Sequence, residues 1–193
     1  MSPAPARTSV DAIVAAARRI LEADGLAALT MRSVAEAVGV KGPSLYKRVP
    51  DREALLRAVA DSVVGDLSTT MARASATDDP AADVRAAVLA YRAFVRRNPN
   101  GYRLLFTELP SGASPDPAIL AALGEPVVRA MAGIAGEPRA LDAARTVVAW
   151  AHGFVTMELA GAFRLGGDLE NAYLFGIDAI LAGVSERASP ASG

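Results

Sequence analysis

Apolar residues recur at helical spacing along most of the chain, and no segment of useful length alternates as a β-strand would. The first such stretch runs from about Ser9 to Asp24, where Gly25 provides a stop. Further on, an apolar residue recurs every four positions, at Leu55, Val59, Val63, Leu67 and Met71. This spacing draws a single stripe along a long helix. The pattern predicts an all-α chain of about nine helices.

Local start and stop signals divide the first fifty residues into three short helices. Thr30 can cap a second helix, which Gly39 ends after barely two turns. Pro43 suits the first position of a third helix, because its missing N–H is not needed there. Pro50 ends that helix and Asp51 caps the long one. We therefore expect three short helices followed by a larger helical body.

Proline, glycine and aspartate mark the ends of the later elements too. After a linker at Ala76–Asp79, the expected spans are Pro80–Asn98, the short aromatic segment Tyr102–Leu109, Pro117–Gly136, Pro138–Phe163 and Asp168–Glu186. Loose tails are expected at residues 1–6 and 189–193.

Composition agrees with helix and narrows the chemistry. Alanine contributes 42 of the 193 residues, and alanine is the strongest helix former. The chain has no cysteine and one histidine, which excludes disulfide scaffolds, thiolate metal sites and clusters of imidazole ligands. No catalytic constellation and no glycine-rich phosphate loop is present. We expect no metal, no cofactor and no enzymatic activity; a small helical enzyme is a remote alternative.

The charge is unevenly distributed. Residues 7–57 hold nine Lys and Arg against six Asp and Glu, whereas residues 58–193 hold eleven against fifteen. A basic head on an acidic body favours contact between the head and a polyanion. The longest run without a charged residue is 12 residues, against about 20 for a membrane-spanning helix. With no signal-peptide pattern at the N-terminus, a cytoplasmic protein without a membrane contact is expected.

Residues 30–52, TMRSVAEAVGVKGPSLYKRVPDR, have the pattern of a helix-turn-helix. Two short helices meet at Gly39–Val40, and their apolar residues can pack together. In this arrangement the second helix enters the DNA major groove. Side chains on and beside that helix can donate hydrogen bonds to phosphates or bases, namely Lys41, Ser44, Tyr46, Lys47 and Arg48. The alternative is a helical hairpin with a solvated basic face.

Residues 9–63 resemble the N-terminal domain of the tetracycline-repressor (TetR) family through the motifs ADGLAALTM, RSVAEAVGV, PSLYKRV and DREALLRAVA. The resemblance implies a bacterial transcription regulator, in most members a repressor. The family positions that contact DNA match Thr30, Arg32, Gly42, Pro43, Ser44, Tyr46, Lys47 and Arg48, and Arg52 matches a phosphate contact.

The sequence departs from the family pattern at three positions of this segment. Arg48 stands where His is usual, Val49 where Phe is frequent, and Gly42 has no side chain to read a base. Base readout is therefore expected to rest more on Lys47 and Arg48.

The run Trp150–Phe163 is similar to a tryptophan–histidine–glycine motif in one group of TetR-family C-terminal domains, where the last two helices form a dimer interface. The helix over 138–163 is apolar on two sides, and the next carries a stripe of small residues. The expected interface comprises Val148, Val155, Leu159, Ala172, Tyr173, Gly176, Ile177, Ile180, Gly183 and Val184. An intramolecular core is the alternative for each.

A ligand pocket is expected inside the helical body, with aromatic and methionine side chains that suit an adaptable apolar cavity. The candidates are Met71, Tyr91, Phe94, Tyr102, Phe106, Met131, Trp150, Phe154 and Met157. Ordinary core packing is the alternative for each of them. His152, the single histidine, is expected to be structural.

Together these observations predict a helix-turn-helix DNA-binding domain over residues 7–51 and a ligand-binding and dimerisation domain over 52–188. The expected partners are a near-palindromic operator, a second copy of the chain, and a small apolar or aromatic effector. A DNA-binding dimer that is constitutive, or controlled by a protein partner, explains the same residues.

Overall fold

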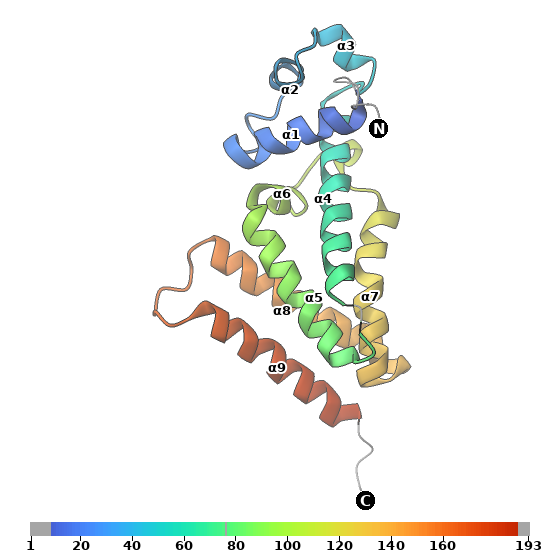
Figure 1. Cartoon of the computed structure of the whole chain (residues 1–193), viewed down its shortest axis with the longest axis vertical. Coiled ribbons are helices and arrows are strands. Elements are labelled where there is room, and N and C mark those ends of the chain that lie inside the picture. Colours follow the sequence, from blue (N-terminus) through green and yellow to red (C-terminus); the bar gives the residue numbers. More distant parts are fainter. Residues whose placement is uncertain (1–8, 76, 189–193) are drawn as a thin grey trace, which may run out of the picture. The chain divides into compact units, whose positions relative to one another are not determined.

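The computed structural model describes residues 9–75 and 77–188 (Figure 1). Over these residues the chain is all-helical, as the sequence predicts, with two short 3-10 helices, η1 (Ser111–Ala113) and η2 (Glu137–Arg139), and no strand. The nine α-helices are α1 (Val10–Asp24), α2 (Met31–Val38), α3 (Gly42–Tyr46), α4 (Arg52–Ala74), α5 (Pro80–Arg97), α6 (Pro99–Leu104), α7 (Pro117–Ala135), α8 (Ala140–Leu159) and α9 (Leu169–Ala188). The expected tails and Ala76 of the expected linker lie outside the described residues.

Hydrogen-bonded caps are present at the helix ends. The Ser9 hydroxyl accepts a hydrogen bond from the Ala12 N–H at 3.1 Å, at the start of α1. Thr30 and Ser33 form a reciprocal capping box at the start of α2. Gly39 ends α2 in the left-handed conformation, with φ 72° and ψ 35°, which glycine adopts without a steric penalty. These local signals are why the first helices begin and end where the sequence predicts.

Two predicted spans are wrong. α6 occupies Pro99–Leu104, so the helix begins before the aromatic segment at Tyr102–Leu109 and ends inside it. α8 ends at Leu159 and does not continue to Phe163. The reason is Gly161, which has a positive φ of 62°. Its N–H bonds to the Glu158 carbonyl while the Ala162 N–H bonds to the Met157 carbonyl, a pattern that closes a helix C-terminus.

The chain forms two compact units. Of the described residues, the first unit contains those through Asp66 together with Asn98–Leu120, and the second contains the rest of α4, α5 and the residues from Ala121 onward. The division falls within α4, a continuous helix from Arg52 to Ala74.

The first unit has its core between α1, α2, α3 and the beginning of α4. Side chains that are at most 1% exposed fill it: Ile13, Leu21, Leu29, Val34, Leu45, Leu55, Leu56 and Val59. α6 is held to α1 by Glu22, whose carboxylate accepts hydrogen bonds from the backbone N–H groups of Asn100 and Gly101 at 3.1 and 2.7 Å. These N–H groups lie in the first turn of α6, where an acceptor is needed.

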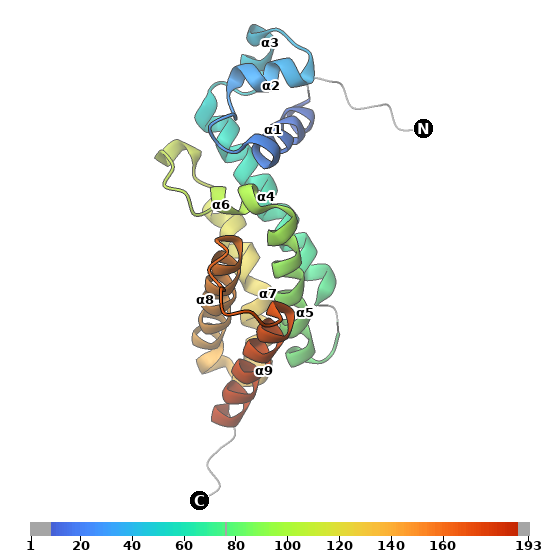
Figure 2. The same ribbon diagram turned by 90° about the vertical axis from the view of Figure 1, so that its left-hand side faces the viewer.

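In the second unit α5, α8 and α9 lie side by side (Figures 1 and 2). Their buried apolar residues include Val88 of α5, Val147 and Val155 of α8, and Tyr173 and Ile177 of α9. The Tyr173 hydroxyl donates a hydrogen bond to the Val88 carbonyl at 3.1 Å. Tyr173 is therefore both packed and hydrogen-bonded within its own chain.

α7 has an unusual composition. Among the described residues it alone is long and apolar enough to cross a membrane, judged by length and composition only. It nevertheless carries Glu125 and Arg129 near its middle, and charged side chains are costly in hydrocarbon. Pro126 lies inside the helix and has no N–H, so the Ala122 carbonyl cannot receive the usual helical hydrogen bond.

Candidate functional site

The α2–turn–α3 segment presents a polar surface because its apolar residues are anchored in the core. Leu45 and Val49 are 1% and 3% exposed, and the residues between them face outward. Tyr46 is 51% exposed, and Lys47 and Arg48 are also exposed. The helix-turn-helix predicted from the sequence is thus formed, with its donors available to an external anion.

The N-terminal end of α3 is also exposed and polar. Lys41 occupies the N-cap position without a side-chain cap, followed by Gly42 and Pro43. Lys41 and Ser44 are exposed, as is Pro43. Within the described part of the chain neither Lys41, Lys47 nor Arg48 takes part in an ion pair. The cations of this surface are therefore not neutralised internally.

Three candidate residues already have partners. Thr30 is used as the α2 cap, where its hydroxyl accepts the Ser33 N–H at 3.0 Å. Arg32 donates to Glu36 at 2.9 Å, and this hydrogen bond, with the nearby negative charge, raises the pKa of Arg32. Arg52 directs its guanidinium toward the carbonyls of Leu29 and Leu26, at 3.3 and 3.5 Å. Arg52 thereby links the start of α4 to the α1–α2 loop.

The structure does not bring the nine predicted ligand-binding residues into one cavity. Tyr102 and Phe106 lie in the first unit, with ring centroids 5.1 Å apart. The other seven lie in the second unit, where their surroundings differ. Phe94 and Met131 are buried in the core, Tyr91 is half-buried and Met157 is 47% exposed.

Trp150 and Phe154 pack against α9. The Trp150 ring is stacked on Tyr173 with centroids 4.8 Å apart, and Phe154 meets the same ring at 4.9 Å. Trp150 also lies against Gly176, where an added Cβ would overlap its indole ring. These two aromatic residues therefore join α8 to α9.

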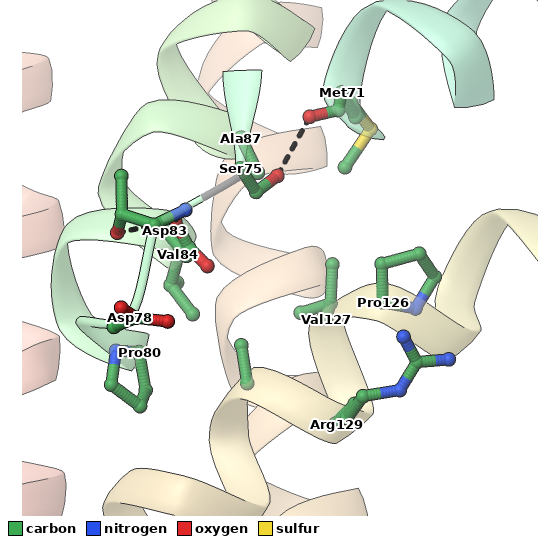
Figure 3. Close-up of a pocket in the computed structure, with 12 residues that line it drawn as sticks. Met71, Ser75, Asp78, Pro80, Asp83, Val84, Ala87, Pro126, Val127 and Arg129 are labelled. Carbon is green, nitrogen blue, oxygen red and sulfur yellow. Dashed lines mark hydrogen bonds between the residues drawn. The ribbon is translucent and has the colours of Figure 1, made fainter. Parts of the chain in front are cut away.

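A cavity of about 230 Å³ lies in the second unit, between the end of α4, the turn to α5, α5 itself and α7 (Figure 3). Of the predicted set, only Met71 lines it. The lining residues are Met71, Ser75, Thr77, Asp78, Pro80, Asp83, Val84, Ala87, Pro126, Val127, Arg129 and Ala130. Sequence reasoning missed eleven of them, because aromatic and methionine content does not reveal where three helices leave a space.

The predicted interface residues divide into two groups. Val155, Tyr173 and Ile177 are at most 1% exposed and belong to the core of their own unit. The rest are wholly or partly accessible, although Trp150 packs against Gly176: Val148, Leu159, Ala172, Gly176, Ile180, Gly183 and Val184. Phe175, which the sequence pattern did not single out, is 76% exposed on α9.

Sequence reasoning also missed Arg92 on α5. Arg92 is only 4% exposed and donates to both carboxylate oxygens of Glu158 at 2.8 Å, and to Glu170 as well. Its guanidinium carbon lies 5.0 Å from the Tyr173 ring centroid and 5.9 Å from that of Phe154. A signal was present, because Arg92 falls on the buried helical stripe formed by Val84, Val88 and Val95.

Two family models match the chain. One, described as "Bacterial regulatory proteins, tetR family", matches residues 13–59, and the other, "Tetracyclin repressor-like, C-terminal domain", matches residues 84–180. An uncharacterized HTH-type transcriptional regulator of Mycobacterium tuberculosis is 37% identical over 164 residues, which cover 81% of this chain and 73% of that protein.

Solved structures share the fold. A protein with unknown function from Rhodococcus sp. RHA1 has a TM-score of 0.80 at 25% identity, covering 95% of this chain and 97% of that one. A TetR variant from Acinetobacter baumannii AYE in complex with minocycline has a TM-score of 0.70 at 24% identity, covering 94% and 99%. BioQ from Mycobacterium smegmatis has a TM-score of 0.66 at 26% identity, covering 92% and 97%.

Proposed function

Because the chain belongs to the TetR family of bacterial transcription regulators, which are DNA-binding helix-turn-helix proteins and not enzymes, we propose that it is a repressor. It binds a near-palindromic operator as a homodimer, and a small ligand releases it. The surface around α3 carries the DNA-binding part of this proposal. Lys41, Lys47 and Arg48 are exposed there without internal ion pairs, beside the exposed hydroxyls of Ser44 and Tyr46.

The exposed donors have separable roles. Tyr46 and Arg52 bind phosphates, which position the protein but carry no sequence information. Lys47 and Arg48, at and just beyond the end of α3, reach base edges or the adjoining phosphates. Thr30 and Arg32, at the start of α2, contact the backbone beside the groove. The N-terminal residues of α3, Gly42 and Pro43, allow the protein backbone to approach the DNA closely.

Exposed apolar residues of α8 and α9 support a homodimer. Leu141 and Val148 of α8 are each 49% exposed, and Phe175 of α9 is 76% exposed. A second copy that covers these side chains removes apolar surface from water, which favours association. A homodimer with two-fold symmetry also fits a palindromic operator, whose half-sites lie about 34–36 Å apart or somewhat further.

The cavity supports control by a ligand. Met71, in the last turn of α4, lines the cavity, and the same continuous helix begins at Arg52, a proposed phosphate contact. A ligand that favours one tilt of α4 changes operator affinity by its differential affinity for the two arrangements, typically about 5- to 150-fold. The proposed site of action is the cytoplasm, where the operator DNA is.

Selection from a random duplex library tests the DNA-binding part of the proposal. Purified full-length chain should enrich an inverted repeat, and sedimentation at micromolar concentration should show a dimer both free and bound to the selected duplex. Enrichment of a single non-repeated half-site, or a monomer in both measurements, would contradict the homodimeric repressor. Repression itself is tested by placing the selected duplex between a promoter and a reporter gene and comparing expression with and without the chain.

A further inference from the structure

The cavity between α4, α5 and α7 has an apolar part and a polar part. Met71, Val84, Ala87 and Val127 provide hydrophobic contact. The polar part comes from the α4–α5 turn and the first turn of α5, and consists of Ser75, Thr77, Asp78 and Asp83. In Figure 3, Asp78 and Asp83 lie across the cavity from Val127 and Pro126 of α7. A ligand that fills the cavity therefore meets carboxylates on one side and apolar groups on the other.

The charges around the cavity do not cancel. Arg129, its one cationic lining residue, is 3.3 Å from Glu125 on its own helix and its side chain is 75% exposed, so its charge is balanced outside. Asp83 accepts hydrogen bonds from the N–H and hydroxyl of Thr77 at 3.0 and 2.8 Å, both at the same carboxylate oxygen. Within the described residues neither Asp78 nor Asp83 takes part in an ion pair. The polar side is therefore negative.

The lining also restricts the kind of cation. Quaternary ammonium groups are bound mainly by aromatic faces, and none of the residues that line the cavity is aromatic. Carboxylate oxygens bind best to a cation that carries N–H donors, because charge-assisted hydrogen bonds are short and strong. The cavity volume of about 230 Å³ lies below the range of roughly 300–1,000 Å³ usual for drug-sized ligands. The part of a ligand held inside the cavity must therefore be small.

We propose that this cavity binds a small protonated amine, with its ammonium group at the carboxylates of Asp78 and Asp83 and a compact aliphatic body against Met71, Val84 and Val127. The inference rests on the proposed function, since it names the chemical class of the effector. The bound amine joins the α4–α5 turn to α7 and so acts on the end of α4.

Calorimetric titration of the full-length chain with four probes of one shape tests the ligand class. The probes are cyclohexylmethylamine, its N,N,N-trimethyl derivative, cyclohexylmethanol and cyclohexylacetate. We expect the amine to bind roughly 10- to 100-fold more tightly than each of the others, because only the amine forms charged hydrogen bonds to the aspartates. Equal or tighter binding of any other probe, or no binding of the amine, would overturn the proposal.

Charge-removing variants locate the site. Asp83→Asn keeps an oxygen that can accept the Thr77 hydrogen bonds, so the turn remains in place while the charge is lost. Asp83→Asn should weaken amine binding about tenfold or more. Asp78→Asn should weaken it by a smaller factor, because Asp78 is exposed and water screens its charge. Asp24→Asn, an exposed residue at the end of α1, removes the same charge away from the cavity and should leave amine binding unchanged. Equal affinity in all three variants would place the amine elsewhere and overturn the proposal.

Measurements of operator binding distinguish the amine proposal from the proposal of ligand-responsive repression. If cyclohexylmethanol or cyclohexylacetate binds in preference to the amine and releases the selected operator, the amine class is wrong and ligand-responsive repression stands. If the amine binds, depends on both aspartates and leaves operator affinity unchanged, the amine site stands and release by this ligand is wrong.

Discussion

Positively charged side chains on the α3 surface and on α5 have opposite surroundings. On the helix-turn-helix surface Lys47 and Arg48 are exposed and take part in no ion pair within the described residues. In the second unit Arg92 is 4% exposed and is surrounded by Glu158, Glu170 and two aromatic rings. The same kind of side chain is thus available to an outside anion on the α3 surface and fully engaged on α5. Composition alone cannot tell these roles apart; burial and partners do.

The free-energy cost of burying the charge of Arg92 explains why its guanidinium is surrounded by so many partners. A charge removed from water is tolerated only when opposite charges and hydrogen bonds replace the water. The pKa of Arg92 is raised, first by its hydrogen bond to Glu158 and then by the one to Glu170, while burial opposes the increase. Arg92 therefore stays charged and ties α5 to α8 and to the start of α9.

The largest expected effect is on the stability of the second unit. Arg92→Ala leaves the half-buried Glu158 without its bidentate partner, and removing one member of a buried pair costs about 3–5 kcal/mol. Denaturant unfolding at fixed protein concentration should show this loss. Arg96→Ala is the matched control on the same helix, because Arg96 is 58% exposed and 3.9 Å from Glu158, and its loss should cost at most about 1 kcal/mol. Equal losses in both variants would refute the contrast between buried and exposed cations.

The next effect is on DNA binding, with stability unchanged. Replacing both Lys47 and Arg48 by alanine should weaken operator binding roughly 10- to 100-fold, and should reduce the dependence of affinity on salt by about one unit of slope for each phosphate that the variant no longer binds. Arg164→Ala removes an exposed positive charge from the α8–α9 loop and should change neither quantity. An unchanged salt slope in the double variant would show that the α3 surface does not meet DNA phosphates.

A smaller effect on stability is expected from alanine substitutions at two glycines of α9, and it should have opposite signs. Gly176→Ala should destabilise the chain by about 1–2 kcal/mol, because the new Cβ overlaps the Trp150 ring, which is already held by Tyr173. The fluorescence of Trp150, the only tryptophan, should shift as well. Gly183→Ala meets nothing within 4 Å and should stabilise the helix by about 0.5–1 kcal/mol. If both variants were stabilised, the close packing of α8 on α9 at Trp150 would be incorrect.

The smallest effect concerns an exposed pair of the second unit. Arg85 donates to Asp178 at 2.8 Å, and this hydrogen bond lowers the pKa of Asp178. The pair therefore stabilises the fold above the ordinary aspartate pKa of about 3.9, and this contribution is lost as the pH falls through the lowered pKa. Thermal unfolding of wild type and Asp178→Asn should differ slightly at neutral pH and converge in acid. A difference that grows in acid would reverse the assigned direction.

Local chemistry made most of the fold predictable. Ser9, Thr30, Gly39 and Asp79 act on backbone groups within a few residues, so their effect can be read from the sequence. The end of α8 was misplaced although Gly161 marks it, because the apolar run continues past that glycine to Phe163.

The exposed basic surface around α3, which is the proposed DNA contact, could be anticipated for the same local reason, since it is one short segment. The cavity could not, because its walls come from residues as distant in sequence as Met71 and Ala130. Arg92 was overlooked because a charged residue on a helix is usually solvated, and only its partners on α8 and α9 show otherwise. The cavity and the Arg92 ion pairs depend on contacts between helices that are distant in sequence, so the sequence alone does not predict them.

Pro126 affects where the wall of the cavity opens locally. Because the Ala122 carbonyl lacks its helical hydrogen bond, that turn of α7 has the lowest free energy of local opening in the helix. Backbone amides around it should exchange with deuterium sooner than those toward Ala135. Since Pro126 and Val127 also form a wall of the cavity, the segment that opens first is the wall that the proposed ligand would contact. A ligand bound in the cavity should therefore slow the hydrogen–deuterium exchange of the backbone amides in this one turn.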